Sequence, residues 1–321
     1  MRFFGRKKQN KATSQSSLSK AYSRLHEPRI TGIFWLGLKA NDVLGEATFL
    51  ERTLGLRFVD EGNTALGHHI IFNCGPVLLE LVEGRVTWAH LPKPRRGSPD
   101  VALIPGFQVD DLAAIYANLN EREVPITQMF DQGWVSNLLF FDPERNIWQV
   151  SETRNSAPIG SSGFEHLGVL WLAVADLEAQ LRFYRDLLGL PLVDLGGGVR
   201  PITERAEKVW QENGSKPELQ QESENSGMGA VFFSEGTRLA LSPGGIKPDE
   251  HRARVWGKDT PFQIGFRATG LKELAHIFSA RGVSFSGPHE DSDIGIWISI
   301  TDPEGNISRV IEPPPHSLYL R

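Results

Sequence analysis

Four segments of the chain share one pattern of hydrophobic and polar positions. Each begins with apolar residues at alternate positions, which predicts a strand. An acidic or polar residue follows, and after it apolar residues recur about every 3.6 positions, which predicts a helix. Each helix leads into another apolar run that begins a further strand. The segments are FWLGLKANDVLGEATFLERTLGLRFV from Phe34, IPGFQVDDLAAIYANLNEREVPI from Ile104, VLWLAVADLEAQLRFYRDLLGLPLV from Val169 and IGFRATGLKELAHIFSARGVSF from Ile264.

The polar residue at each junction is interpreted as a helix cap. Asp42, Asp111 and Asp176 stand where a side-chain oxygen accepts hydrogen bonds from the first free amides of a helix. Thr269 or Gly270 takes this place in the fourth segment. The three carboxylates are therefore expected to be structural and not catalytic.

A longer repeat overlies the first. DPERNIWQV at 142–150 matches DPEGNISRV at 302–310, and NCGPVLLEL at 73–81 matches SEGTRLALS at 234–242. Both pairs are turn sequences between short β-rich runs, which predicts hairpins. Each unit is therefore expected to contain a strand, a helix and about three further strands.

The repeats predict two modules of two units each. The expected divisions are a disordered basic tail at 1–29, a first module at 30–152, a linker at 153–163 and a second module at 164–315 with a polar insert at about 196–228. The linker sequence TRNSAPIGSSG is small, polar and rich in Pro and Gly.

Composition and charge exclude several classes of protein. Among 321 residues, Cys74 is the single cysteine, which excludes a disulfide framework and a cysteine-based metal site. No stretch approaches the roughly 18 apolar residues of a membrane-spanning helix. The net charge of the chain is −5, and residues 1–29 carry +7. The remainder therefore carries −12 and is a poor surface for nucleic acid. A cytoplasmic monomer without membrane or nucleic-acid partners is expected.

Two motifs resemble the vicinal oxygen chelate superfamily, which includes glyoxalase I, bleomycin-resistance proteins and extradiol dioxygenases. They are the strand–Asp-Leu–helix–Phe-Tyr-x-x-x-Leu-Gly-Leu segment from Asp176 to Leu190 and the DPEGN hairpin at 302–306. The resemblance covers about residues 30–315. It implies an α+β fold of four βαβββ units, paired into two modules, in which each pair curls eight strands into an open cup. Neighbouring units are expected to form each pair.

The resemblance also implies a divalent metal held by His, Glu or Gln on the first and last strands of each unit. We find a poor set of donors at these positions. In the first module they are Trp35, Ile104, Glu80 and Gln149, and in the second Val169, Gln263, Ala240 and Arg309. Glu80 is a weak candidate metal ligand, and Arg309 would repel a divalent cation. Of His68 and His69, at most one enters the cup because adjacent strand residues face opposite sides. No standard metal site is therefore expected.

Seven side chains are candidate ligand-binding residues because they lie on the inner strand face or at former metal positions. Tryptophans there either line a cup for a planar or apolar molecule or fill it as core. Arg309 either binds a ligand anion or pairs with Asp291 or Asp293. Lys39 and Glu80 are also a possible internal ion pair. The candidates are Trp35, Lys39, Glu80, Gln149, Trp171, Gln263 and Arg309.

Three functions are compatible with these residues. The first is metal-free binding of a small organic molecule, planar or anionic, with no cofactor. The alternative is a glyoxalase-like lyase or ring-cleaving dioxygenase that holds Fe, Mn, Ni or Zn through shifted ligands. The third is a scaffold whose basic tail docks on an anionic partner.

Overall fold

The computed structural model describes residues 27–64, 67–84, 103–131, 135–153, 160, 163–196, 229–234, 236–243, 254–292 and 294–317. The predictions made for the basic tail before residue 27, for most of the linker and for the insert after Gly196 concern residues outside these ranges.

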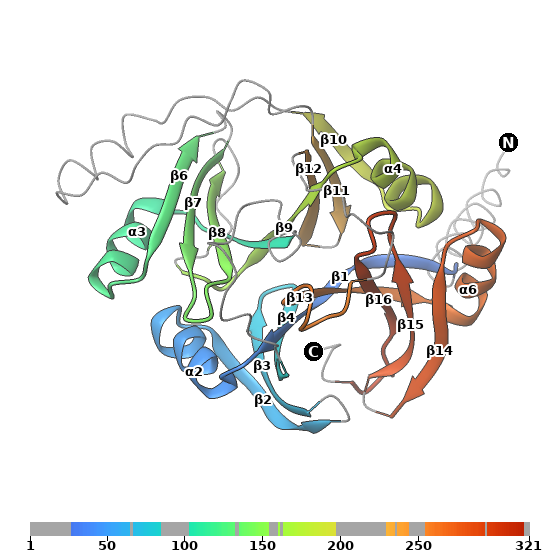
Figure 1. Ribbon diagram of the computed structural model, residues 1–321, viewed down its shortest axis with the longest axis horizontal. Coiled ribbons are helices and arrows are strands. Elements are labelled where there is room, and N and C mark those ends of the chain that lie inside the picture. The colour runs from blue at the N-terminus through green and yellow to red at the C-terminus, as the bar shows by residue number, and fades with distance from the viewer. Residues whose placement is uncertain are drawn as a thin grey trace, which may run out of the picture.

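Each repeat folds into the expected βαβββ unit (Figure 1). The first contains β1 (Arg29–Ala40), α2 (Val43–Thr48) with a π-helical turn η1 (Phe49–Thr53), β2 (Arg57–Thr64), β3 (Gly67–Cys74) and β4 (Val77–Glu83). The second contains β5 (Leu103–Gln108), α3 (Leu112–Glu121), β6 (Ile126–Asp131), β7 (Val135–Phe141) and β8 (Ile147–Thr153). The third contains β9 (Leu167–Val174), α4 (Leu177–Leu181) with η3 (Arg182–Leu187), β10 (Leu192–Gly196), β11 (Gly229–Ser234) and β12 (Thr237–Pro243). The fourth contains β13 (Phe262–Thr269), α6 (Leu271–Ala280), β14 (Phe285–Asp291), β15 (Gly295–Thr301) and β16 (Ile307–Glu312).

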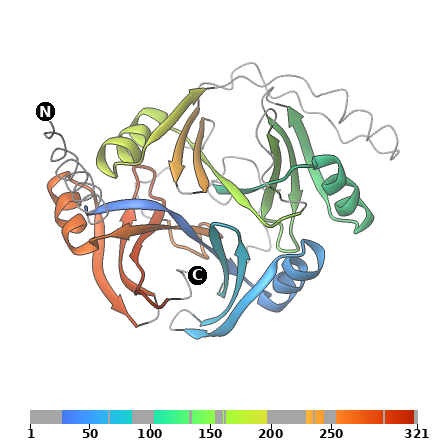
Figure 2. The ribbon, with the colours of Figure 1, turned by 180° about the vertical axis from the view of Figure 1, so that it is seen from behind.

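The units pair differently from the prediction that sequence neighbours share a sheet. One eight-stranded sheet has the order β14-β15-β16-β13-β1-β4-β3-β2 and joins units one and four; we call it cup A. The other has the order β10-β11-β12-β9-β5-β8-β7-β6 and joins units two and three; we call it cup B. The two curved sheets are seen end-on in Figure 1 and from behind in Figure 2.

The seam between paired units explains why the sequence does not determine which units share a sheet. The first strand of every unit has one free edge, and it pairs antiparallel with another first strand: β1 with β13, and β5 with β9. A Cβ added at Gly265 of β13 would lie 2.7 Å from the Trp35 ring, and one at Gly106 of β5 would lie 2.6 Å from Val169. Because a glycine relieves the contact in both seams, it does not select one pairing over another.

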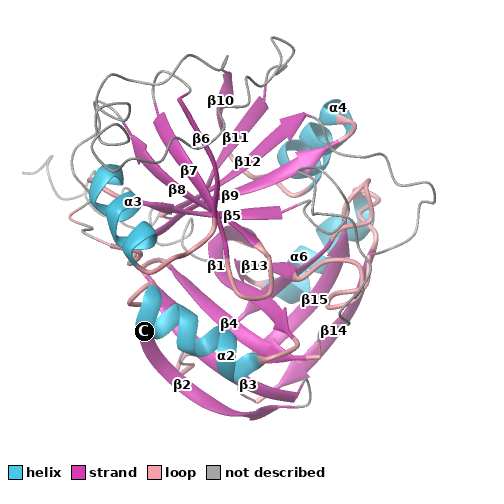
Figure 3. Ribbon diagram, turned by 60° about the vertical axis from the view of Figure 1, so that its left-hand side comes forward, coloured by secondary structure: helices cyan, strands magenta, loops and turns pink. Residues whose placement is uncertain are grey.

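Units that are neighbours in sequence are joined across the two sheets by their turns. Glu144 Oε1 accepts hydrogen bonds from the Asn41 and Asp42 amides at 2.5 and 2.6 Å. Glu304 Oε1, at the matching position of the second DPE turn, accepts from Ala175 and Asp176 at 2.7 and 2.9 Å. In the figures α2 lies beside α3 and α4 beside α6, at opposite sides of the molecule (Figure 3). The two units within each longer repeat therefore contact each other across the two sheets and do not share one sheet.

The predicted helix caps are confirmed. Asp42, Asp111 and Asp176 accept from the amide three residues later, at 2.9, 3.1 and 3.0 Å. Gly270 begins the fourth helix in a left-handed conformation, and the Glu312 carboxylate accepts from its amide at 2.9 Å. Among the described residues, no helix combines the length and apolarity needed to cross a membrane.

The main core lies between the two sheets and under the helices. Trp148 is fully buried there and faces away from its cup, as its alternation with Gln149 predicts. Its ring stacks on Phe107 at 5.6 Å and meets Phe262 of the other sheet edge-on at 5.3 Å, while its Nε1 donates to Asp142 at 2.8 Å.

Two carboxyl groups are buried together in this core. Asp142, in the first DPE turn, accepts from the Asn146 amide at 2.7 Å and hydrogen-bonds with Glu46 of α2. Burial raises the pKa of Asp142. At the matching place in the other half, Gln180 of α4 lies beside Asp302. A carboxyl pair needs one retained proton, whereas a Gln–Asp pair carries its own donor.

We expect Glu46→Gln to make stability less dependent on pH. A carboxyl whose pKa is raised by folding stabilises the fold at low pH, and this contribution is lost as pH rises from about 4 through the folded-state value. The variant should therefore exceed the wild type in free energy of unfolding by at least about 1 kcal/mol at pH 8 and by less at pH 5. Urea unfolding at a series of pH values measures this.

The matched variant Gln180→Glu creates a carboxyl pair beside Asp302 and should steepen the fall in stability with pH. If stability changed with pH in parallel for all three proteins, a proton retained between Glu46 and Asp142 would be contradicted.

Candidate functional site

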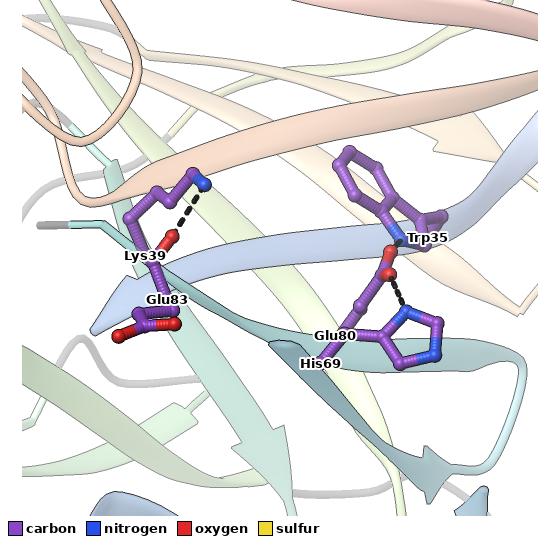
Figure 4. A network of polar contacts seen from close by, with 5 residues as sticks. All are labelled: Trp35, Lys39, His69, Glu80 and Glu83. Atoms are coloured by element: carbon purple, nitrogen blue, oxygen red, sulfur yellow. Dashed lines mark hydrogen bonds and ion pairs between the residues drawn. The ribbon is translucent and has the colours of Figure 1, made fainter. Parts of the chain in front are cut away.

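A buried hydrogen-bonded cluster occupies the metal position of cup A (Figure 4). Glu80 on β4 is 4% exposed, and its Oε2 accepts from Trp35 Nε1 of β1 at 2.6 Å. Its Oε1 lies 2.8 Å from His69 Nδ1 of β3. Because β3 pairs with β4 so that Ile71 is opposite Glu80, His69 shares the face of Glu80 one step along the sheet. His68 faces outward and pairs with Glu61, so one histidine of the two enters the cup, as expected.

The charges of this cluster shift the pKa values of its neighbours. The hydrogen bond that His69 donates to Glu80 raises the pKa of His69 despite partial burial. Burial lowers the pKa of Lys39, and the charge of Arg309 lowers it further. Lys39 Nζ donates to the Glu83 carbonyl oxygen at 2.6 Å (Figure 4). Glu80 is thus held by Trp35 and His69, where the sequence suggested an ion pair with Lys39.

Arg309 lies within a cage of three tryptophans. Its Cζ is 4.8 Å from the ring centre of Trp297, 5.4 Å from that of Trp35 and 5.6 Å from that of Trp256. Trp256 comes from the segment before β13 and is held by a 2.9 Å bond from its Nε1 to the Pro261 carbonyl. Aromatic faces stabilise a guanidinium that is only 8% exposed. The side chains of Asp291 and Asp293, the suggested acidic partners, lie outside the described part of the chain.

Side chains fill most of cup A. The gap beside Glu80 measures about 210 Å³, including space open to solvent, and is enclosed by Phe34, Trp35, Ile294, Arg309 and Ile311. Gln263, another predicted ligand residue, is 6% exposed nearby on β13. The interpretation of Trp35 as core therefore holds for this cup.

The residues of both cups are a poor fit to the divalent metal that the fold implies. Cup A offers Glu80 and the neutral Gln263 with Trp35 and Arg309 at the four positions, and the guanidinium opposes a metal cation. In cup B they are Ile104, Gln149, Val169 and Ala240. Across the described ranges, no group of three His, Cys, Asp or Glu side chains is arranged to hold a metal ion.

Cup B contains the larger of the two described pockets, with about 390 Å³ of empty space that is partly open to solvent. Its lining comes from β11, β12, β9, β5, β8 and β7, and its wall is mainly apolar. Arg238 is beside Val169 and Ala240 beside Trp171 in the β12–β9 register. The lining residues are Gln108, Val135, Ser151, Thr153, Gly168, Val169, Trp171, Val231, Arg238 and Ala240.

A polar network on β7 and β8 adjoins this wall and includes the lining residue Ser151. Gln149 Nε2 donates to Asn137 Oδ1 at 2.7 Å and to Ser151 Oγ at 2.9 Å, while the Ser151 hydroxyl donates to Asn137 Oδ1 at 2.8 Å. These bonds fix the Asn137 amide with its oxygen saturated. Its Nδ2 and the Trp171 Nε1 are buried and have no hydrogen-bond partner among the described residues.

The seven predicted site residues are thus divided between the cups in a new way. Gln149 and Trp171 lie in cup B, and the other five come together in cup A. His69 was not predicted to be the partner of Glu80, although the turn at Gly75 fixes the register that joins them. Arg238 was not predicted either, although alternation places it on the same face as Ala240. No sequence pattern indicated that Trp256 enters cup A.

The chain forms two curved sheets, each built from two paired βαβββ units. In each sheet the four positions at the centre of the cup lie on the first and fourth strands of its units, and this architecture defines a class of protein. Residues 32–150 and 163–309 both match the model of the Glyoxalase/Bleomycin resistance protein/Dioxygenase superfamily, and the chain belongs to this superfamily.

Solved structures agree on the fold. A putative dioxygenase from Bacillus subtilis subsp. subtilis str. 168 is 14% identical, with 89% of this chain and 86% of that chain covered and a TM-score of 0.61. Glyoxalase I from Zea mays is 15% identical, with 91% and 94% covered and a TM-score of 0.61. A comparison with curated protein sequences finds no significant match. At these identities the likeness shows the fold alone.

We expect His69→Gln to destabilise the protein more at pH 6 than at pH 9. Because the folded-state pKa of His69 is raised, its ion pair with Glu80 contributes fully below the unfolded value of about 6.5 and is lost as pH rises through the folded value. The cost should be about 1 kcal/mol at pH 6 and smaller at pH 9, measured by chemical denaturation. His68→Gln, the exposed neighbour, serves as control. An equal cost for His69→Gln at both pH values would show that the pair is uncharged.

Proposed function

We propose that the protein binds a small organic molecule in the pocket of cup B and does so without a metal ion. The observation that carries this proposal is the contrast between the two cups. The 390 Å³ space in cup B has a mainly apolar wall, while the equivalent space of cup A is taken up by the protein's own tryptophans and Arg309.

The composition of the cup B pocket supports this function. Ligand sites are usually concave, mainly apolar and supplied with a few polar groups that orient the ligand. Val169, Val231 and Ala240 give the apolar wall, and the Trp171 side chain adds a flat surface. Gln108, Ser151 and Thr153 add a few neutral polar groups to this wall, which can orient a ligand.

The metal positions of cup B support the metal-free part of the proposal. Ile104, Val169 and Ala240 have no metal-binding atom in their side chains, and Gln149, whose Nε2 donates to Asn137 and Ser151, offers one neutral oxygen. Binding alone requires only a complementary surface, whereas the chemistry of the superfamily's enzymes requires a metal with open coordination positions. In cup A, Glu80 is held by Trp35 and His69.

Filling the cup B pocket should abolish binding. Ala240 is 1% exposed and lies beside Trp171, so Ala240→Phe places a ring in the space that a ligand would occupy. We expect the neutral planar probe 2-naphthamide to bind the wild type in isothermal titration calorimetry and to bind this variant at least about tenfold more weakly.

The control is Ile71→Phe, which adds the same ring to the inner face of cup A, opposite Glu80. It should leave probe binding unchanged, with folding of both variants checked by thermal unfolding. Loss of binding in the control, or retention in Ala240→Phe, would place the site elsewhere.

Metal content separates this function from a metal-dependent enzyme. Protein purified without chelators and then incubated with Fe²⁺, Mn²⁺, Ni²⁺ or Zn²⁺ should retain far less than one ion per chain in elemental mass spectrometry, because a single carboxylate opposed by Arg309 holds a divalent ion weakly. Glu80→Gln should not change this value. Near-stoichiometric metal that is lost in Glu80→Gln would favour the lyase or dioxygenase alternative.

A further inference from the structure

The lining of the cup B pocket has an unbalanced set of charges. Of its described residues, Arg238 is the one with a formal charge, and none is a carboxylate. Arg238 is exposed, so its guanidinium is in contact with solvent at the edge of the pocket. The pocket therefore presents a positive charge without an internal counter-charge among the described lining residues.

One neutral polar group of the pocket is also available as a donor. Thr153 Oγ1 accepts from the lining residue Gln108 through its Nε2 at 3.3 Å, which leaves the Thr153 hydroxyl proton to donate. A ligand that supplies acceptor oxygens satisfies this hydroxyl and the Arg238 guanidinium.

The two arginines of the inner faces have different surroundings. Arg309 is 8% exposed and has three tryptophan rings within 5.6 Å, so a ligand would have to displace that packing. Arg238 projects from β12 next to Val169 and two residues from Ala240, at the edge of the larger space. An anion can thus reach Arg238 while an apolar body occupies the pocket.

We infer that the pocket of cup B is specific for planar carboxylates, whose rings lie against Trp171 and Val169 and whose carboxylate binds the Arg238 guanidinium. This inference rests on the proposed function and adds the class of ligand to it. Guanidinium and carboxylate form paired hydrogen bonds, which makes Arg238 the specificity-determining residue.

A pair of probes that differ in charge and share the planar ring tests this inference. The probes are 2-naphthoate and its amide, 2-naphthamide, titrated by calorimetry into the full-length wild type, Arg238→Gln and Ala240→Phe. The matched control is Arg57→Gln, which removes one exposed arginine from β2 of cup A and leaves the net charge equal to that of Arg238→Gln.

We expect 2-naphthoate to bind the wild type more tightly than 2-naphthamide and to lose about tenfold in affinity in Arg238→Gln. The amide should bind both proteins equally, and Arg57→Gln should behave as wild type. The preference for the acid should also decrease as salt rises, because the charge pair is partly exposed.

The remaining outcomes separate the inference from the function on which it rests. If acid and amide bind equally, Arg238→Gln has no effect and Ala240→Phe removes both, the pocket binds planar molecules and the specificity for carboxylates is wrong. Equal loss of acid binding in Arg57→Gln would mean that overall charge is responsible, which also overturns the role of Arg238. If neither probe binds the wild type, or Ala240→Phe leaves binding intact, both the inference and the proposed function are overturned.

Discussion

The pairing of first strands is the constraint on which the rest of the molecule depends. The first strand of each βαβββ unit lies at one edge of its sheet, and its unpaired backbone donors and acceptors need partners. By joining β1 to β13 and β5 to β9, the chain pairs the first strands of all four units and decides which side chains face one another. Had sequence neighbours paired, Trp35 and Arg309 would lie in different cups. The observed seam brings them within 5.4 Å.

This seam produces two cups of different chemical character from units of the same fold. In cup A a bulky indole at the first-strand position is accommodated by glycines on both strands, and the guanidinium of β16 lies among aromatic rings. Cup A therefore contributes packing and internal electrostatics. In cup B the position that matches Trp35 holds Val169, and the position that matches Arg309 holds Gln149. The smaller side chain on the first strand accompanies the larger gap, about 390 Å³ in cup B against about 210 Å³ in cup A.

Much of the fold could be predicted from the sequence because its signals are local. The change from alternating to helical spacing and the aspartate caps depend on residues within a few positions of one another, and the structure confirms them. The pairing of units could not be predicted, because all four first strands have equivalent free edges and Gly106 and Gly265 take equivalent places. Because the pairing was predicted wrongly, Gln149 and Trp171 lie in a different cup from the other candidate residues with which they had been grouped.

The candidate site was predicted less well than the fold for a related reason. Alternation correctly placed Glu80 and Trp35 on an inner face, and the β3–β4 turn contained enough information to add His69. Trp256 lies in a segment without regular spacing, so only its three-dimensional position shows that it reaches Arg309. No feature of the sequence distinguishes the exposed Arg238, because its significance depends on the empty space beside it.

The two cups differ in where they carry positive charge. In a metal-dependent member of this fold, a cation at the centre of the cup attracts the oxygens of a substrate. Here the central charge of cup A is a guanidinium packed among tryptophan rings, and Glu80 in the same cup is held by Trp35 and His69. In cup B the four central positions carry no charge, and the charged residue of the pocket lining is the exposed Arg238. A charge at the edge can orient a bound anion, but it lies away from the apolar centre where a bound ring would sit. This arrangement is the physical basis on which we propose recognition of a molecule and not its chemical conversion.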